Sequence, residues 1–232
     1  MALWPLAGAL LSGKDAGGGI LGHYQKFFHT VEINNSFYQL PPKKTFETWR
    51  QSVPRGFLFA VKGSRYITHM KKLKDPAKSL ARFLSRVEVL REKLGPVLFQ
   101  LPPNWRFNGE RLDSFLEALA GEFRVAFEFR DPSWLRDETL ERLSKHGAAF
   151  CIYDLAGFQS PKEVTADFIY IRLHGPGDRY QGKYPDQTLA GWAGAFAVWA
   201  KAKKEIFCYF DNDQAGYAAR DALRLQEMIA KG

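Results

Sequence analysis

The chain is poor in the features that mark several large classes of protein. Its 232 residues include only two cysteines, Cys151 and Cys208, and no Cys or His residues at zinc-binding spacing. These absences exclude a disulfide-stapled secreted domain and a structural zinc site. Both cysteines fall inside apolar runs, where we expect them to act as small buried hydrophobic groups in a reducing compartment.

Long apolar segments are also absent. The first twelve residues are apolar, but they have no basic leading segment and are too short to span a bilayer. We therefore expect a cytoplasmic protein with no membrane partner.

Several catalytic signatures are missing as well. The sequence contains no Gly-x-Ser-x-Gly elbow and no HExxH or CxxC motif. Glycosidase chemistry stays open only if the fold brings two carboxylates, Glu32 and Glu128, close together.

Apolar residues make up 46% of the chain and aromatic residues 15%, which is typical of a globular protein. The net charge is +8, with basic residues concentrated in the segments 62–75 and 201–204. This charge favours acidic partners, and two interpretations stay open: a solvated basic surface, or a patch that attracts phosphate or nucleic acid.

Seven short apolar runs, most of them followed by a helix-like stretch, dominate what is present. This pattern predicts parallel strands buried on both faces, and hence an α/β fold of the TIM type. The runs are residues 31–39, 57–63, 97–102, 125–131, 149–154, 168–174 and 206–213. Helices are expected over residues 77–95, 110–121, 132–147, 187–204 and 215–230.

A closed barrel needs eight strands, and the sequence supplies seven recognisable ones. The first thirty residues hold no run rich in β-branched residues, and three consecutive glycines at 17–19 favour a loop. We therefore expect the first strand to be missing or replaced. Residues 1–23 are predicted to be an atypical, flexible N-terminal segment, and residues 24–232 a single (β/α) barrel domain.

The segment TVEINNSFYQLP at 30–41 resembles the YecE-like family, the domain of unknown function 72. Further similar blocks are ITHMKKLKD at 67–75, LGPVLFQLPPNW at 94–105, AFEFRDPSWL at 126–135, YIRLHGP at 170–176 and YFDND at 209–213. The resemblance implies a TIM-type barrel without an established reaction. Family members usually open with a strand and a Gly-Thr-Ser-Gly-Trp-like segment, which this chain lacks.

Charged residues sit inside or at the ends of the apolar runs. Glu32 and Asn34 share one face of their strand, and so do Glu128 and Arg130, because side chains alternate with period two. A carboxylate within an apolar run needs a partner or a chemical role. One interpretation is an ion pair of Glu128 with Arg130 or Lys62 that only holds the core together.

The functional interpretation has these groups converge at the carboxyl ends of the strands. Glu32 and Glu128 are then acid–base groups or ligands of a divalent metal, and His174 is a metal ligand or proton relay. A histidine at a strand end is often only structural, so that alternative stays open. The predicted substrate-binding residues are Asn34, Tyr38, Lys62, Gln100, Arg130, Trp134, Asp154, Arg172, Tyr184 and Asp211.

The residue types favour an enzyme, a hydrolase or lyase, that acts on a phosphorylated or nucleotide-like anionic substrate at the C-terminal rim of the barrel. One alternative is a non-catalytic protein that binds an anionic small molecule or nucleic acid. Another is an inactive paralogue with a degenerate N-terminus.

Overall fold

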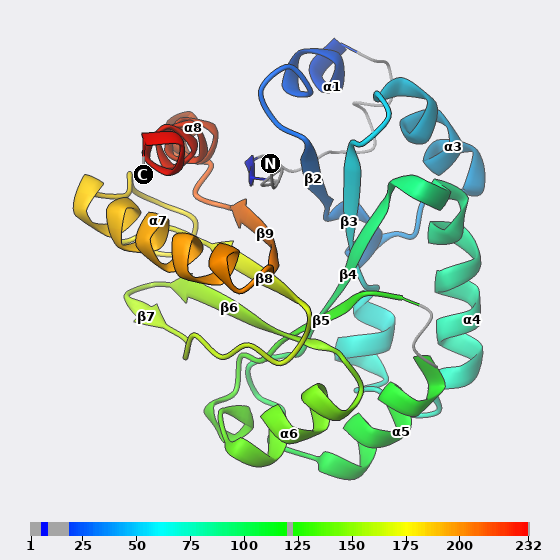
Figure 1. Cartoon of the computed structure of the whole chain (residues 1–232). Coiled ribbons are helices and arrows are strands. Elements are labelled where there is room, and N and C mark those ends of the chain that lie inside the picture. The colour runs from blue at the N-terminus through cyan, green and yellow to red at the C-terminus, as the bar shows by residue number, and fades with distance from the viewer. Residues whose placement is uncertain (1–5, 9–18, 120–122, 232) are drawn as a thin grey trace.

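Parallel strands wrap into a nearly closed barrel with helices on the outside (Figure 1). The computed structural model describes residues 6–8, 19–119 and 123–231. Among these residues the sheet runs in the order β1-β9-β8-β6-β5-β4-β3-β2, with β7 paired only to β6. All ladders along this path are parallel. The expected TIM-type barrel is confirmed.

Each of the seven predicted runs contributes a strand. They are β2 (Thr30–Ile33), β3 (Leu58–Lys62), β4 (Leu94–Gln100), β5 (Val125–Glu128), β6 (Ala149–Leu155), β8 (Phe168–Leu173) and β9 (Glu205–Phe210). The short strand β7 (Phe158–Gln159) folds back antiparallel on β6. It lies in the connection between β6 and β8, for which the sequence predicted no helix.

An additional strand, β1 (Leu6–Gly8), pairs parallel with β9 and corrects the expectation that the first thirty residues hold no strand. It occupies the place of a first barrel strand and lies close to β2 (Figure 1). The residue types at positions 6–8 did not predict a strand, because a three-residue strand at a sheet edge is held by backbone pairing more than by β propensity. Within the described residues no ladder joins β1 to β2.

The predicted flexible segment 1–23 is only partly described. Residues 1–5 and 9–18 lie outside the described residues, so the prediction is not tested there. The described parts are β1 and the short helix α1 (Gly19–Tyr24).

Two predicted elements differ most from the structure in their boundaries. The run 31–39 is a strand only to Ile33, and the chain then turns into helix α2 (Asn35–Tyr38), in which the Ser36 hydroxyl donates to the Ile33 carbonyl. The helix expected to reach residue 95 ends as α4 (Pro76–Val87) and continues as a 3-10 helix over Glu88–Lys93. Gly95 lies within β4, close to the neighbouring strand. A Cβ at this position would stand 3.2 Å from the Phe59 carbonyl oxygen, which is tight for any residue other than glycine.

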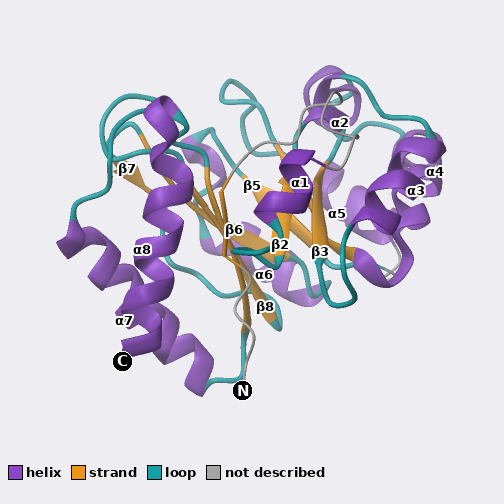
Figure 2. Ribbon diagram, turned by 90° about the horizontal axis from the view of Figure 1, so that it is seen from above, coloured by secondary structure: helices purple, strands orange, loops and turns teal. Residues whose placement is uncertain are grey.

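The remaining helices surround the strands, as the view from above shows (Figure 2). They are α3 (Lys43–Ser52), α5 (Gly109–Leu119), α6 (Asp137–Lys145), α7 (Asp186–Lys201) and α8 (Tyr217–Lys231). Outward-facing aromatic residues pack between sheet and helices: Phe99 contacts Phe83 of α4, Phe115 of α5 and Phe127 of β5. No helix of the described residues is long and apolar enough to cross a membrane.

The barrel interior is filled by the alternate residues of each strand, as in TIM barrels generally. In its middle layer Tyr209 of β9 shares a hydrogen bond of 2.9 Å with the Thr30 hydroxyl of β2. The Tyr170 ring of β8 lies 5.1 Å from the Tyr209 ring. These aromatic and hydroxyl contacts lie in the barrel interior, below the charged side chains at the carboxyl ends of the strands.

Candidate functional site

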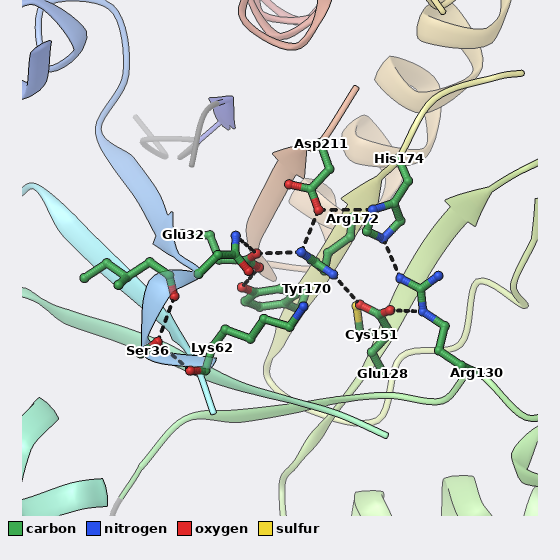
Figure 3. A network of polar contacts seen from close by, with 12 residues as sticks. Glu32, Ser36, Lys62, Glu128, Arg130, Cys151, Tyr170, Arg172, His174 and Asp211 are labelled. Atoms are coloured by element: carbon green, nitrogen blue, oxygen red, sulfur yellow. Dashed lines mark hydrogen bonds and ion pairs between the residues drawn. The ribbon is translucent and has the colours of Figure 1, made fainter. Parts of the chain in front are cut away.

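The guanidinium of Arg172, on β8, binds carboxylates from three other places on the rim (Figure 3). Its Nη2 donates to Glu32 of β2 at 2.8 Å and to Asp211, just beyond β9, at 2.6 Å. Its Nη1 donates to Glu128 of β5 at 2.9 Å. All four side chains are buried. We call Arg172, Glu32, Glu128 and Asp211 the rim cluster.

Further donors hold each glutamate of the rim cluster in place. Glu32 accepts hydrogen bonds from the Tyr170 hydroxyl at 2.5 Å and from the Asn34 amide at 2.8 Å. Glu128 pairs with Nε of Arg130. Both glutamates are therefore fully engaged by protein groups.

Within the rim cluster, Glu128, Asp211 and Arg172 are ionised at neutral pH. Burial alone would raise the pKa of Glu128, but Arg130 and Arg172 hold it well below its ordinary value. Burial would likewise raise the pKa of Asp211, yet Arg172 and His174 keep it well below the ordinary range. The three carboxylates in turn keep Arg172 charged despite its burial.

His174, two residues after Arg172 on the same face, links the rim cluster to Arg130. Its Nδ1 lies 3.0 Å from the Asp211 carboxylate, and its Nε2 lies 2.9 Å from Nη2 of Arg130. Because a guanidinium can only donate, Nε2 is the acceptor and the ring proton sits on Nδ1, facing Asp211. Burial and Arg172 lower the pKa of His174, so the ring is neutral. The ring is fully buried, with Nε2 bonded to Arg130 and Nδ1 facing Asp211 without meeting the geometry of a hydrogen bond, so His174 positions Arg130.

Lys62, at the end of β3, is the exception in this network. Its ammonium lies 4.7 Å from the centre of the Phe37 ring, and its backbone carbonyl accepts from the Ser36 hydroxyl at 2.6 Å. Among the described residues its nitrogen has no carboxylate within ion-pair distance and no hydrogen-bond acceptor, and Figure 3 shows the side chain reaching beside the cluster. Burial and the Arg172 charge lower the pKa of Lys62 from 10.5 to about 8.

Lys62 borders a cavity of about 280 Å³ at the rim, here called the lysine cavity. Its lining residues are Asn34, Phe37, Tyr38, Lys62, Arg172, Tyr180, Asp211 and Asp213. The Tyr180 ring also packs edge-on against His174, with 5.4 Å between ring centroids. The cavity therefore sits directly on the rim cluster.

A second cavity, of about 380 Å³, is also bordered by Tyr180 and is here called the arginine cavity. Arg130 and Arg179 contribute its charged groups, and Gln100 contributes an amide. The Arg130 guanidinium lies 4.7 Å from the centre of the Tyr153 ring. No acidic residue borders the arginine cavity among the described residues.

Most of the predicted site residues lie together in and around these cavities. The residues concerned are Glu32, Asn34, Tyr38, Lys62, Gln100, Glu128, Arg130, Arg172, His174 and Asp211. The spatial convergence expected from the sequence therefore exists.

Three predicted substrate-binding residues lie elsewhere. Trp134 is fully buried, donates to the Trp105 carbonyl at 2.6 Å and stacks on Phe129. Tyr184 is also buried, and its hydroxyl accepts from the Gly175 backbone at 2.9 Å. Asp154 alternates with the inward-facing Tyr153 and so lies on the outer face of β6, where burial raises its pKa to about 6. The first two are packing residues.

Tyr170 is the functional neighbour that sequence reasoning missed. It shares a strand face with Arg172 and His174 and donates directly to Glu32. The period-two pattern that singled out the other two residues applied equally to Tyr170.

The donor set does not fit the divalent metal that the sequence suggested. Among the described residues no three His, Cys, Asp or Glu side chains are placed to hold a metal ion. The three rim carboxylates converge on the Arg172 guanidinium, which fills the place a cation would take.

A family model described as "Protein of unknown function DUF72" matches residues 8–232. The chain belongs to the DUF72 family. It is similar to UPF0759 protein YunF of Bacillus subtilis, with 24% identity over 93% of this chain and 88% of that protein. UPF0759 protein YecE of Escherichia coli K12 is 30% identical over 58% of this chain and 52% of its own length.

Solved structures of DUF72 proteins share the barrel. One from Thermotoga maritima has a TM-score of 0.81 at 29% identity, covering 92% of this chain and 90% of the other. One from Enterococcus faecalis has a TM-score of 0.84 at 21% identity, covering 98% and 96%, which shows the common fold alone. These likenesses assign no reaction.

Replacing Arg172 by Met should lower the free energy of unfolding by about 3–5 kcal/mol at pH 7, because three buried carboxylates lose their shared cation. Urea unfolding measures the change. The matched control is Arg136→Met, which removes an exposed pair with Glu138 and should cost less than about 1 kcal/mol. Equal effects of the two substitutions would contradict the role given to Arg172.

The same destabilisation should shrink in acid. The depressed pKa values of Glu128 and Asp211 contribute stability above their unfolded values of 4.5 and 3.8, and that stability is lost as the pH falls through the folded values. The gap between the wild-type chain and Arg172→Met should therefore narrow below pH 4.5. A gap that is constant with pH would contradict the ionic origin.

Lys62→Met should stabilise the chain at pH 7, by roughly 1–3 kcal/mol, because it removes a poorly solvated charge. The folded pKa of about 8 lies below the unfolded 10.5, so the penalty is full below pH 8 and fades as the pH rises towards 10.5. Unfolding curves at pH 7 and at pH 10 test this dependence, with the exposed Lys78→Met as control. A loss of stability at pH 7 would show that Lys62 has a partner that offsets its burial.

Proposed function

We propose that the chain is an enzyme that binds a small anionic substrate across the two rim cavities. The anionic group of the substrate lies in the arginine cavity, and its reacting part lies in the lysine cavity beside Tyr180. The observation that carries this proposal is the separation of charge at the rim. Arg172 is paired with three carboxylates, whereas Arg179 and Arg130, the latter paired only with Glu128, border a space with no acidic residue among the described ones.

The chemistry of the arginine cavity suits a phosphate or carboxylate group. A guanidinium presents parallel N–H donors that match the oxygens of both anions. Gln100 adds a neutral amide that can donate to a third oxygen. Arg130 is held by Glu128 and His174, so its guanidinium is already oriented before an anion arrives.

The reaction class of the proposed enzyme is that of a hydrolase or lyase. Glu32, Glu128 and His174, the predicted acid–base groups, support the pocket through Arg172 and Arg130. Groups that remain available towards the lysine cavity are the Lys62 amine, the Tyr180 hydroxyl and the Asp213 carboxyl. Proton transfer in this enzyme is therefore assigned to these three groups.

A non-catalytic binding protein for an anionic small molecule is the second candidate. The observation that favours it is that protein groups already bind Glu32, Glu128 and Nε2 of His174, the expected acid–base residues. Nucleic-acid binding rests only on the net charge of +8 and stays a prediction. A chemically reactive group in the lysine cavity would favour the enzyme over the binding protein.

Inorganic phosphate tests the anion site. Calorimetric titration at pH 7 should give saturable binding, weakened about tenfold or more in Arg179→Met because a charged hydrogen bond is lost. Arg179 is exposed, so its replacement leaves the fold intact. Arg136→Met is the matched surface control and should bind phosphate like the wild type. Absence of saturable binding, or equal binding by both variants, would refute the proposal.

A further inference from the structure

We infer that the amine of Lys62 attacks the carbonyl carbon of an anionic aldehyde or ketone and forms an imine with it. This inference rests on the proposed function and adds the substrate class: a small compound that carries a carbonyl group close to a carboxylate or phosphate. The enzyme is thereby placed among the lyases that use covalent lysine chemistry.

The position of Lys62 is fixed by its backbone. The Ser36 hydroxyl bridges the Lys62 carbonyl at 2.6 Å and the Ile33 carbonyl at 3.1 Å, which ties the end of β3 to the end of β2. The side chain then extends over the Phe37 ring and ends at the wall of the lysine cavity. A nucleophile on a strand end of a packed barrel is better positioned than one on a loop.

Within the described part of the chain, the amine also has no ion-pair or hydrogen-bond partner that competes for it. An amine that donates to a carboxylate keeps its proton and cannot act as a nucleophile. The ammonium of Lys62 lies over the Phe37 ring and forms no ion pair among the residues that the structure describes, although three carboxylates lie nearby. Arg172 draws those carboxylates towards itself, so the buried arginine keeps the lysine free.

The electrostatic balance around Lys62 favours the neutral amine. Burial and the Arg172 charge lower the pKa of Lys62 to about 8, against the opposite influence of Glu128, Glu32 and Asp211. His69, in the π-helix Tyr66–Met70, packs edge-on against Phe37 and has its own pKa lowered by burial and by Lys62. About a tenth of the Lys62 amine is then unprotonated at pH 7, far more than for an exposed lysine.

The covalent step balances with water as the only by-product. The nitrogen lone pair bonds to the carbonyl carbon, and the C=O electron pair moves to oxygen, which takes up a proton. The nitrogen loses a proton, and the hydroxyl group then leaves as water after a second protonation, which gives the C=N bond. A protonated imine withdraws electrons from the adjacent carbon, so that a bond there can break.

Two groups in the lysine cavity suit these proton transfers. Partial burial and the neighbouring Asp211 raise the pKa of Asp213, so its carboxyl can hold a proton nearer neutral pH. Burial raises the pKa of Tyr180, which keeps its hydroxyl protonated. The Asp211 carboxylate, which lines the same cavity, stabilises the positive charge of the imine.

Reductive trapping tests the inference on the full-length chain. The protein is incubated at pH 7 with limiting glyoxylate and sodium cyanoborohydride, which reduces an imine to a stable amine, and the labelled lysines are mapped by peptide mass spectrometry. Lys62 should be labelled about tenfold or more faster than the exposed Lys78. Glycolaldehyde, a neutral aldehyde with the same number of carbons, should label Lys62 more slowly than glyoxylate does.

Variants separate this inference from the proposed function. Lys62→Arg keeps the positive charge, so it should bind phosphate normally and show no adduct at position 62. Arg179→Met should slow labelling of Lys62 by glyoxylate and leave labelling by glycolaldehyde unchanged.

Labelling of Lys62 no faster than Lys78, with phosphate binding intact, would overturn the imine and leave the anion site standing. Fast labelling by both aldehydes without phosphate binding would refute the anion site and leave the reactive amine. A second measurement needs no variant: the rate of reductive methylation of Lys62 with formaldehyde should rise with a midpoint near pH 8, whereas a midpoint near the ordinary lysine value of 10.5 would overturn the inference.

Discussion

The buried guanidinium of Arg172 is the constraint on which the rest of the rim depends. Removing one cation and three carboxylates from water is costly, and the cost is offset only when all of them pair at hydrogen-bond distance. Their strands lie at different places in the barrel: Glu32 comes from one end of the sheet path and Asp211 from the strand next to its other end. Arg172 therefore draws β2 towards β8 and β9 at the place where, among the described residues, no ladder joins β1 to β2. The Thr30–Tyr209 hydrogen bond supports the same seam one layer below.

The same pairing decides which groups are left for chemistry. The residue types and positions of Glu32, Glu128 and His174 make them the first candidates for acid–base catalysis. Each of them is bound by another protein group. Lys62 is the group that this arrangement leaves without an anion. A DUF72 fold does not by itself name a reaction, because barrels host many unrelated chemistries. The features that support the proposed function are therefore the Lys62 amine, the two arginines at the adjoining cavity and their shared neighbour Tyr180.

Period-two patterning was enough to place Glu32, Glu128 and Arg172 on one rim, since each charged residue interrupts an apolar strand that can hide it only inside the barrel. The pattern could not tell which charges pair, because pairing depends on distances between strands far apart in the chain. Trp134 and Asp154 were chosen because they lie near strand ends, and that choice was wrong. Closeness to a strand end does not fix the face on which a side chain lies. Strand β1 escaped notice because its backbone pairs with β9 without the side-chain signals of a strand.

The most direct test of the account is a crystal structure of the full chain soaked with inorganic phosphate. We predict that Arg172 keeps all three carboxylates while phosphate binds at Arg130 and Arg179. Phosphate bound to the Arg172 guanidinium, with Glu32, Glu128 or Asp211 displaced, would contradict the claim that this arginine is a structural centre and that the open positive charge lies elsewhere.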